Sequence, residues 1–269
     1  MGTDKRNRKK ENRRQKLDDL AKQQQSKRTR KLATRGAIFI AVVVGIALII
    51  SVSGDSDSSN TSDTTVATSA PAPVEGRTIT GDTPCPATDG SETRVASFEK
   101  APSNCLEAGK TYTAVVTTNK GEFTIALDQN KAPLAANNFI TLARYKYFDN
   151  TQCHRAIPDF VVQCGDPTAQ GSGGPGYSFA DELPQSGEYK LGSIAMANSG
   201  PNTNGSQFFI ITGDQGITLP PSYTLFGQVT NGLDTTVPAL NAASNPDPAA
   251  NGVPTLEPLT IVSVVITES

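Results

Sequence analysis

The stretch "TQCHRAIPDFVVQCGD", residues 151–166, gathers the side chains of this 269-residue chain that are best suited to chemistry. His154 is the only histidine of the chain, and Arg155 follows it directly. Cys153 and Cys164 stand on either side of a short Pro-Asp turn. These residue types are compatible with three kinds of site: a metal site, a nucleophile with its base, and a binding cleft that needs one cation.

The first two kinds of site find little support elsewhere in the chain. One histidine is too few for a Cys₂His₂ zinc site, and the four cysteines lack the paired short spacings of a four-thiolate site. We therefore expect no metal. Cys153 and His154 are neighbours, and neighbours in a strand point to opposite faces, so they do not form a dyad. The chain also lacks the G-x-S-x-G pattern of the hydrolases.

Two glycine-rich stretches resemble nucleotide-binding motifs without completing them. "GSGGPG", residues 171–176, fits G-x-G-x-x-G, but Pro175 interrupts it and no convincing helix follows. "GPNTNGSQ", residues 200–207, has the glycine spacing of a P-loop and lacks its Gly-Lys-Ser/Thr end. We therefore reject dinucleotide binding and phosphate binding at these stretches, and we expect no cofactor.

The elements around these residues are mostly strands. "TYTAVVTT" and "GEFTIAL" are β-rich runs joined by the hairpin signal "NKG", and "CHRAI" and "FVVQC" form a second pair around "PD". Further strands are expected in "GSIAMA", "QFFIIT", "TLFGQV" and "LTIVSVVIT", and helices in "APLAANNFITLARYKYF" and "NGLDTTVPALNAA". This count predicts a mainly β fold, a closed eight-stranded antiparallel β-barrel capped by two helices.

The N-terminal part of the chain has a different composition. Residues 1–35 carry 14 of the 24 Lys and Arg but only four of the 26 Asp and Glu, and contain no aromatic residue for stacking on bases. We read them as a disordered cytoplasmic tail that acts as a topology signal, and we expect no nucleic-acid partner. Residues 36–53 contain the uncharged stretch "AIFIAVVVGIALIISV", which favours a transmembrane anchor over a cleaved signal peptide or a buried core helix.

Two further segments separate this anchor from the β-rich region. Residues 54–76 are low in complexity and lack aromatic residues, which is typical of a disordered stalk. Residues 77–110 form a short extension with few large apolar residues, and they contain Cys85 and Cys105. All four cysteines follow the anchor, and an even number in an extracytoplasmic region suggests disulfides. Free buried thiols are the alternative for Cys153 and Cys164.

Several stretches together resemble one family in their order and spacing. "CHRAIPDFVVQCGDP", "GSGGPG", "MANSGPNTNGSQFFI" and "FGQV" are similar to the cyclophilin peptidyl-prolyl isomerases, and the similarity covers about residues 111–269. The resemblance implies a barrel with a cleft on its outside face. It also implies that these residues form an isomerase domain, as in bacterial, membrane-anchored members, and it does not extend to residues 1–110.

The resemblance also implies roles for individual residues. The catalytic arginine corresponds to Arg155, with His154 as its companion and Gln163 as an orienting residue. The substrate-binding positions correspond to Phe160, Val161, Ala197, Asn198, Gln207, Phe209, Leu219 and Tyr223. Val161 replaces the usual methionine and Tyr223 stands where many members have histidine, so the pocket wall differs in shape.

The reaction of this family suits these residue types. Rotation about an X-Pro amide breaks no bond but meets a barrier of about 18–20 kcal/mol. A guanidinium that donates a hydrogen bond to the prolyl nitrogen weakens the amide resonance, and an arginine stays charged at physiological pH. We therefore expect a peptidyl-prolyl cis-trans isomerase. A catalytically weak module that binds proline-containing peptides is the alternative.

The same hairpin suggests how the cysteines pair. Strand pairing around "PD" brings Cys153 and Cys164 opposite or nearly opposite each other, close to the separation that a disulfide needs. We predict a Cys153–Cys164 bridge and a separate Cys85–Cys105 bridge.

We expect the protein to be a monomer in the cell membrane, with its N-terminus in the cytoplasm. Its catalytic domain would lie outside the cytoplasm and assist the folding of extracytoplasmic proteins by acting on their proline-containing segments.

Overall fold

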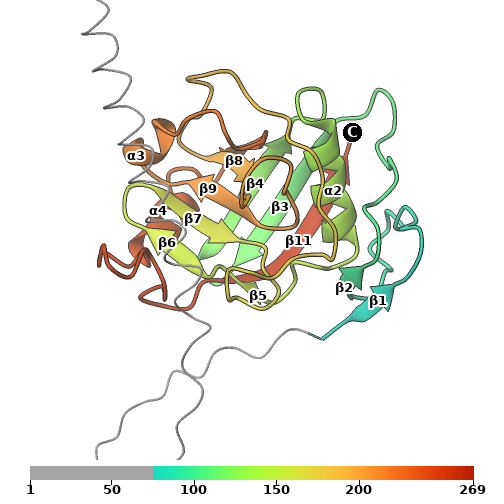
Figure 1. Cartoon of the computed structure of the whole chain (residues 1–269), viewed down its shortest axis with the longest axis horizontal. Helices are drawn as coiled ribbons and strands as arrows, with labels where there is room; N and C mark the ends of the chain where they lie inside the picture. Colours follow the sequence, from blue (N-terminus) through green and yellow to red (C-terminus); the bar gives the residue numbers. More distant parts are fainter. Residues whose placement is uncertain (1–74) are drawn as a thin grey trace, which may run out of the picture. The chain divides into compact units, whose positions relative to one another are not determined.

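The computed structural model describes residues 75–269, which fold mainly as β-structure (Figure 1). The predicted cytoplasmic tail, the anchor and nearly all of the stalk lie outside the described residues. Between residues 75 and 269, no helix is long and apolar enough to cross a membrane.

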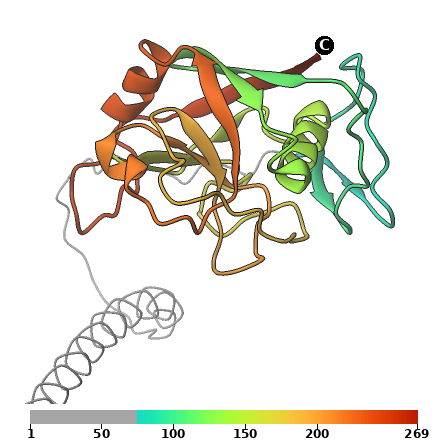
Figure 2. The same cartoon turned by 90° about the horizontal axis from the view of Figure 1, so that it is seen from above.

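The largest assembly of strands among the described residues is one antiparallel sheet of nine strands, in the order β5-β11-β3-β4-β10-β8-β9-β7-β6. Figures 1 and 2 show the sheet curling around the core, with α2 at one end and α3 and α4 at the other. The strands of this sheet are β3 (Tyr112–Thr118), β4 (Gly121–Leu127), β5 (Thr151–Gln152), β6 (Arg155–Ile157), β7 (Val161–Cys164), β8 (Ser193–Met196), β9 (Phe208–Ile211), β10 (Leu225–Asn231) and β11 (Thr260–Glu268).

The predicted closed barrel of eight strands is not confirmed. The sheet has nine strands, and its two edge strands, β5 and β6, are not paired with each other in the described part of the chain. These edges contain only two and three residues, so neither offers a ladder for closure. The strands are consecutive in the sequence, and Cys153 and His154 alone connect them. The covalent chain therefore passes directly from one edge of the curled sheet to the other.

The alternation of side chains along the strands creates two apolar layers. In β3, every second residue is buried, as expected for a strand with one face on the core. All four residues of β8 and of β9 are buried, so both faces of these strands are covered. Phe208 and Ile210 of β9 point into the main core, whereas Phe209 and Ile211 belong to a second, smaller cluster on the outer face.

Both predicted helices are present, as α2 (Pro133–Arg144) and α4 (Thr236–Ala242), together with the short helix α3 (Asp214–Ile217). Pro133 occupies the first turn of α2, where its missing N–H costs nothing. The carboxylate of Glu182 accepts hydrogen bonds from the backbone N–H groups of Leu134 and Ala135, at 2.9 and 3.0 Å. An acidic group from a distant loop thus satisfies the exposed amides at the start of the helix.

The extension before residue 111 packs into the same core as the sheet. Its strands β1 (Arg77–Ile79) and β2 (Val95–Phe98) form a small parallel pair. Phe98 is 2% exposed, and its ring centroid lies 5.6 Å from that of Tyr145 and 6.2 Å from that of Tyr177. The buried aromatic ring therefore attaches a segment with few strands of its own to the β-rich region.

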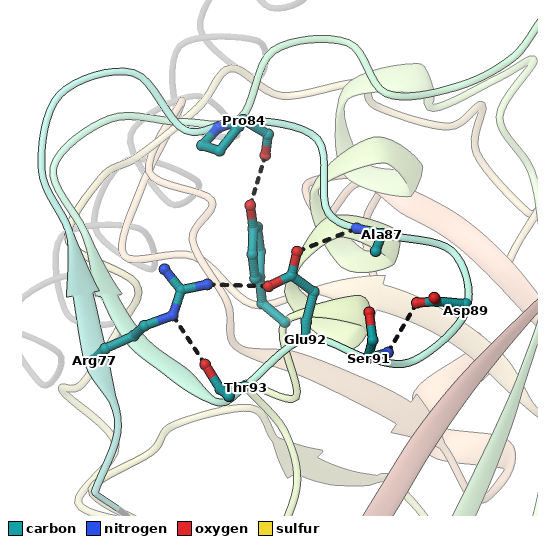
Figure 3. A network of polar contacts seen from close by, with 8 residues as sticks. Arg77, Pro84, Ala87, Asp89, Ser91, Glu92 and Thr93 are labelled. Atoms are coloured by element: carbon teal, nitrogen blue, oxygen red, sulfur yellow. Dashed lines mark hydrogen bonds and ion pairs between the residues drawn. The ribbon is translucent and has the colours of Figure 1, made fainter.

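Polar contacts reinforce the extension at its surface and at its base. The guanidinium of Arg77 donates hydrogen bonds to Glu92 at 3.1 Å and to Thr93 at 3.2 Å. Glu92 also accepts a hydrogen bond from the backbone N–H of Ala87 (Figure 3). Deeper in the molecule, the guanidinium of Arg94 donates to the carbonyl oxygens of Lys146, Tyr147 and Asp149. Burial lowers the pKa of Arg94, but an arginine remains charged under these conditions.

Both predicted disulfides are present. Cys85 and Cys105 are joined with a Cα–Cα distance of 5.4 Å, and Cys153 and Cys164 with one of 3.9 Å. In the β6–β7 ladder Arg155 faces Gln163, so continuing the register places His154, and not Cys153, opposite Cys164. The bridge therefore joins positions one residue out of register, at the crossing between the two sheet edges.

Candidate active site

Four residues from neighbouring strands lie side by side on the outer face of the sheet. Arg155 on β6 is paired with Gln163 on β7, Gln163 with Phe209 on β9, and Phe209 with Ala195 on β8. Residues paired directly across antiparallel strands point to the same face. The sheet therefore places one cation, one amide and one aromatic ring in a row.

A chain of hydrogen bonds fixes the direction of the polar groups in this row. Nη1 of Arg155 donates to Oε1 of Gln163 at 3.2 Å, and Nε2 of Gln163 donates to Oε1 of Gln207 at 2.9 Å. Nε2 of Gln207 in turn donates to the carbonyl oxygens of Gly171 and Gly173, at 3.1 and 2.8 Å. Each amide accepts on one side and donates on the other, so all three side chains are oriented together.

The glycine-rich loop at the end of this chain is held from inside by Asp166, which is fully buried. Its carboxylate accepts hydrogen bonds from the backbone N–H and hydroxyl of Thr168, both at 2.7 Å, and from the backbone N–H of Gly173 at 2.9 Å. Burial alone would raise the pKa of Asp166, but these hydrogen bonds outweigh it and lower that pKa. The loop is thus anchored on an ionised carboxylate.

A second group supports Arg155 on the opposite side. Nε of Arg155 donates to the backbone oxygen of Asn251 at 3.0 Å, and Nη2 donates to its side-chain Oδ1 at 3.1 Å. Arginine has five N–H donors. Together with the contact to Gln163, three donors are engaged by residues that the structure describes, and two point elsewhere. Burial lowers the pKa of Arg155 without removing its charge.

An apolar cluster lies beside this arginine on the same face. Phe209 and Tyr223 meet edge to face, with ring centroids 5.3 Å apart, an arrangement that aromatic pairs prefer. The cluster around them consists of the buried residues Val161, Tyr189, Ala195, Phe209 and Ile211 and the half-buried residues Phe160, Ala197, Ile217, Leu219, Tyr223 and Leu225. The half-buried members keep part of the apolar surface of this cluster exposed to solvent.

Tyr189 joins this cluster to the backbone of Tyr223. It is 1% exposed, its hydroxyl donates to the backbone oxygen of Tyr223 at 2.6 Å, and it accepts from the backbone N–H of Tyr223 at 3.1 Å. Burial raises the pKa of Tyr189 to about 12, so the hydroxyl stays neutral and able to donate. No sequence signal pointed to this role, because a lone tyrosine in a loop carries no motif.

A groove continues from the row of polar side chains and shares Gln163 and Gln207 with it. Its volume is ≈ 690 Å³. The backbone N–H of Ala197 donates to the backbone oxygen of Gln207 at 2.9 Å, and the amide of Asn198 donates to the backbone oxygen of Ser222 at 2.9 Å. The groove is lined by Gln163, residues 171–178, 197–199, Thr203 and 205–207. Five of its sixteen lining residues are glycines, whose backbone amides and carbonyls are not covered by side chains.

His154 lies apart from this row. It is 8% exposed, and its Nδ1 has no hydrogen-bond partner among the described residues. Burial lowers the pKa of His154, the charge of Arg155 lowers it further, and the carboxylate of Asp166 opposes both. A side chain added at Gly171 would lie 3.5 Å from the imidazole, so His154 packs beneath the glycine-rich loop. The catalytic role expected for His154 stays a prediction.

The structure therefore brings together most residues that the sequence singled out. Arg155, Gln163 and Gln207 form one hydrogen-bonded chain. The neighbouring apolar cluster contains Phe160, Val161, Phe209, Leu219 and Tyr223. Tyr189, Asn251 and Ile211 are additional residues of the site. The sequence offered a signal for Asp166, since this acidic residue lies two positions after Cys164. Among residues 75–269, no group of histidine, cysteine and acidic side chains could hold a metal ion.

The comparison with protein families agrees with this geometry. The family described as "Cyclophilin type peptidyl-prolyl cis-trans isomerase/CLD" matches residues 113–266. The chain belongs to the cyclophilin-type peptidyl-prolyl cis-trans isomerase family.

Curated relatives and solved structures give the same picture. A Mycobacterium tuberculosis protein named "Probable peptidyl-prolyl cis-trans isomerase B" is 39% identical over 166 residues, 56% of this chain and 53% of the relative. A Staphylococcus aureus protein named "Putative peptidyl-prolyl cis-trans isomerase" is 50% identical over 100 residues, 36% of this chain and 51% of the relative. The chain thus spans about half the length of the curated relatives that it matches.

A Cryptosporidium parvum cyclophilin-type isomerase is similar in structure, with a TM-score of 0.51 and 32% identity, covering 58% of this chain and 98% of that one. A second crystal structure of that protein, in the presence of the dipeptide Ala-Pro, gives a TM-score of 0.50 at the same identity and coverage.

Proposed function

We propose that this protein is a peptidyl-prolyl cis-trans isomerase and that Arg155 stabilises the twisted X-Pro amide. The observation that carries the proposal is the guanidinium of Arg155, which is held on two sides beside a half-exposed apolar cluster and keeps two donors unpaired among the described residues. An uncatalysed X-Pro bond takes about 10–100 s to isomerise. The reaction needs apolar contacts that bind the proline ring and a fixed cation beside its nitrogen, and the site contains both kinds of group.

The proposed mechanism has no covalent step. The pyrrolidine ring packs against the apolar side chains of Phe160, Val161, Phe209, Leu219 and Tyr223. As the amide twists, the prolyl nitrogen becomes pyramidal and accepts a hydrogen bond from Arg155. This contact is stronger in the twisted state than in either planar state, so it lowers the barrier. Gln163 keeps the guanidinium in place, because its own amide is fixed by Gln207.

The groove supports recognition of the chain next to the proline. Ala197, Asn198 and Gln207 line it, and the remaining N–H of the Asn198 amide is available to a peptide carbonyl. The related structure obtained in the presence of Ala-Pro supports a proline-containing peptide as the substrate class. His154 contributes by supporting the glycine-rich loop from below. All these groups come from one chain, which supports an active monomer.

Arg155→Ala provides the test of this mechanism. We expect turnover of a proline-containing peptide to fall roughly 10²–10³-fold, as when one preorganised donor is removed from a transition state. Arg155→Lys is the matched control, since it keeps the charge but loses the planar fork, and it should recover only part of the activity. Wild-type turnover in Arg155→Ala would contradict the proposal. A wild type that binds the peptide without isomerising it would indicate a binding module.

We also propose that the catalytic domain lies outside the cytoplasm, anchored by residues 36–53, where it assists the folding of extracytoplasmic proteins. The basic residues before this apolar stretch and the two disulfides support this orientation. Protease added to intact cells should cut the 54–76 stalk and release an active domain. A natural N-terminus just after Val52, or resistance to external protease that is lost on lysis, would contradict the anchored orientation.

A further inference from the structure

The support that Asn251 gives to Arg155 comes from a part of the chain far from the cysteine hairpin. Asn251 lies between α4 and β11, 96 positions after the arginine, and its side chain is exposed. It contacts the guanidinium twice, through its backbone oxygen at 3.0 Å and through Oδ1 at 3.1 Å. The single contact from Gln163, at 3.2 Å, is the other polar restraint on this group among the described residues.

The two contacts from Asn251 occupy one edge of the guanidinium. They engage Nε and Nη2, whereas Gln163 engages Nη1. Because the guanidinium is planar and its donors form a rigid fork, two bonds on one edge fix its rotation. One donor remains on Nη1 and one on Nη2. The direction of these two donors therefore depends on Asn251 as much as on Gln163.

The backbone around Asn251 is built to present it to β6. Asn251 has a φ of 51°, and this left-handed conformation is one that asparagine adopts more readily than most residues. Gly252 follows, and a side chain there would lie 2.7 Å from the backbone oxygen of Ala156. The backbone N–H of Ala156 donates to Gly252, and that of Asn245 donates to Ala156, both at 3.0 Å. The loop is thus hydrogen-bonded to the residue next to Arg155.

We infer that Asn251 is a positioning residue for Arg155, which sets the direction of the two donors that face the substrate. The inference rests on the proposed isomerase function. Asparagine meets both requirements of the position, a left-handed backbone and a short side chain that ends in an acceptor. A longer acceptor would displace the guanidinium, and a residue without an acceptor would leave Nη2 without its partner.

Asn251→Gly in the full chain tests this inference. Glycine tolerates the left-handed backbone, so the change removes Oδ1 without adding strain, and the exposed position carries no core packing. We expect kcat to fall about tenfold with KM little changed and the melting temperature close to wild type, since a charge-assisted hydrogen bond to the reacting group is lost. Asn251→Asp keeps an acceptor at the same distance and should recover most of the kcat.

Two comparisons make this result specific. Asn150 is also left-handed, with a φ of 58°, and exposed, so Asn150→Gly is the matched control and should keep wild-type kcat. If Asn251 acts through the arginine, then adding Asn251→Gly to Arg155→Ala should reduce kcat no further.

Full kcat in Asn251→Gly, or no recovery in Asn251→Asp, would overturn the inference. An equal loss in Asn150→Gly, or an additive loss in the double variant, would also overturn it. If Arg155→Ala itself keeps wild-type turnover, the proposed function fails first. If Arg155→Ala is inactive and Asn251→Gly is fully active, only the role of Asn251 fails.

Discussion

Cys153 and Cys164 lie inside the main hydrophobic core, 3% and 1% exposed, whereas Cys85 is exposed and Cys105 is half-buried in the extension. The buried bridge lies where the hydrogen-bonded ladder stops between the two sheet edges, next to Arg155 and Gln163. The exposed bridge closes the loop from Cys85 to Cys105, which contains β2 but not its parallel partner β1. The contribution of each disulfide to stability therefore depends on the other contacts that restrain its segment.

Contacts other than the disulfide attach much of the extension to the rest of the described domain. Phe98 lies in the aromatic core, Arg94 binds three carbonyl oxygens, and the backbone N–H of Phe98 donates to the oxygen of Pro175 at 2.8 Å. Pro175 belongs to the glycine-rich loop that lines the groove. The extension is therefore joined both to the core and to the site, and the exposed bridge is only one of its attachments.

Phe98→Ala gives the largest effect that this comparison predicts. Truncating a fully buried phenylalanine costs about 3–5 kcal/mol of unfolding free energy, and the ring of Phe98 contacts aromatic residues of the sheet region. Denaturant unfolding of the described domain measures the change. Leu256→Ala is the control, because the side chain of Leu256 is 61% exposed. A substitution at such a surface position should change the unfolding free energy by less than about 0.5 kcal/mol. A Phe98→Ala change as small as this would show that the extension is only loosely attached.

Replacing Cys153 and Cys164 together by alanine should have the next largest effect. Opening a loop of this size costs about 3 kcal/mol in the chain-entropy model, and the loss of buried sulfur adds to it. Because the bridge flanks Arg155 and Gln163, we also expect kcat to fall while the peptide is still bound. Urea titration and peptide turnover measure the two effects. Lower stability with an unchanged kcat would limit this bridge to a structural role.

Replacing Cys85 and Cys105 by alanine should cost less. The chain-entropy model gives an upper limit of about 3 kcal/mol for this loop, but the segment can open locally without global unfolding, so only part of this cost should appear. Turnover should stay at the wild-type level, because Phe98 still holds Pro175. A mild thiol reductant should open this exposed bridge first, as mapped by alkylation. Earlier reduction of the buried bridge would reverse the comparison.

The smallest expected effect is a pH dependence of the unfolding free energy, which arises from His154 beside the buried bridge. Burial lowers the pKa of His154 in the folded chain. The unfolded chain, with a histidine pKa of about 6.5, therefore takes up a proton before the folded one. The stability from neutral His154 is present above about pH 6.5 and declines as the pH falls below it, by at most about 1.4 kcal/mol per pH unit. Thermal unfolding from about pH 8 to about pH 5 measures this decline. His154→Gln should remove it, and an unchanged profile in that variant would assign the decline to other groups.

Local patterns predicted the parts of the site that lie close in the sequence. The Pro-Asp turn and the β-rich runs on either side of it placed Arg155 near Gln163, and the same pairing brought the two nearby cysteines together. Resemblance to the family then added Phe209 and Gln207, which strand pairing alone could not have located. Alternate residues of β8 and β9 point to opposite faces, but the sequence does not show that the outer face is covered. That becomes clear only once the neighbouring strands are known.

Contacts between distant segments could not be predicted in this way. Asn251 reaches Arg155 across 96 positions, and the hydroxyl of Tyr189 meets the backbone of Tyr223. Both contacts depend on how loops fold back on the sheet. The hydrophobic periodicity of a sequence does not predict the path of a loop. The unpaired edges of the sheet were also missed, because a strand count does not show which neighbours exchange hydrogen bonds. The buried position of Phe98 was missed because its segment contains few other apolar residues.

The short edges of the curled sheet have a consequence for association between copies of the chain. Exposed edge strands are templates for unwanted pairing and aggregation, and long, flat edges are the most dangerous. Here β5 and β6 offer only two and three residues, and the loop around Gly252 already occupies the backbone of Ala156 on β6. An incoming strand would find almost no unpaired amides in register. A protein proposed to handle unfolded chains would thereby avoid joining their β-aggregates.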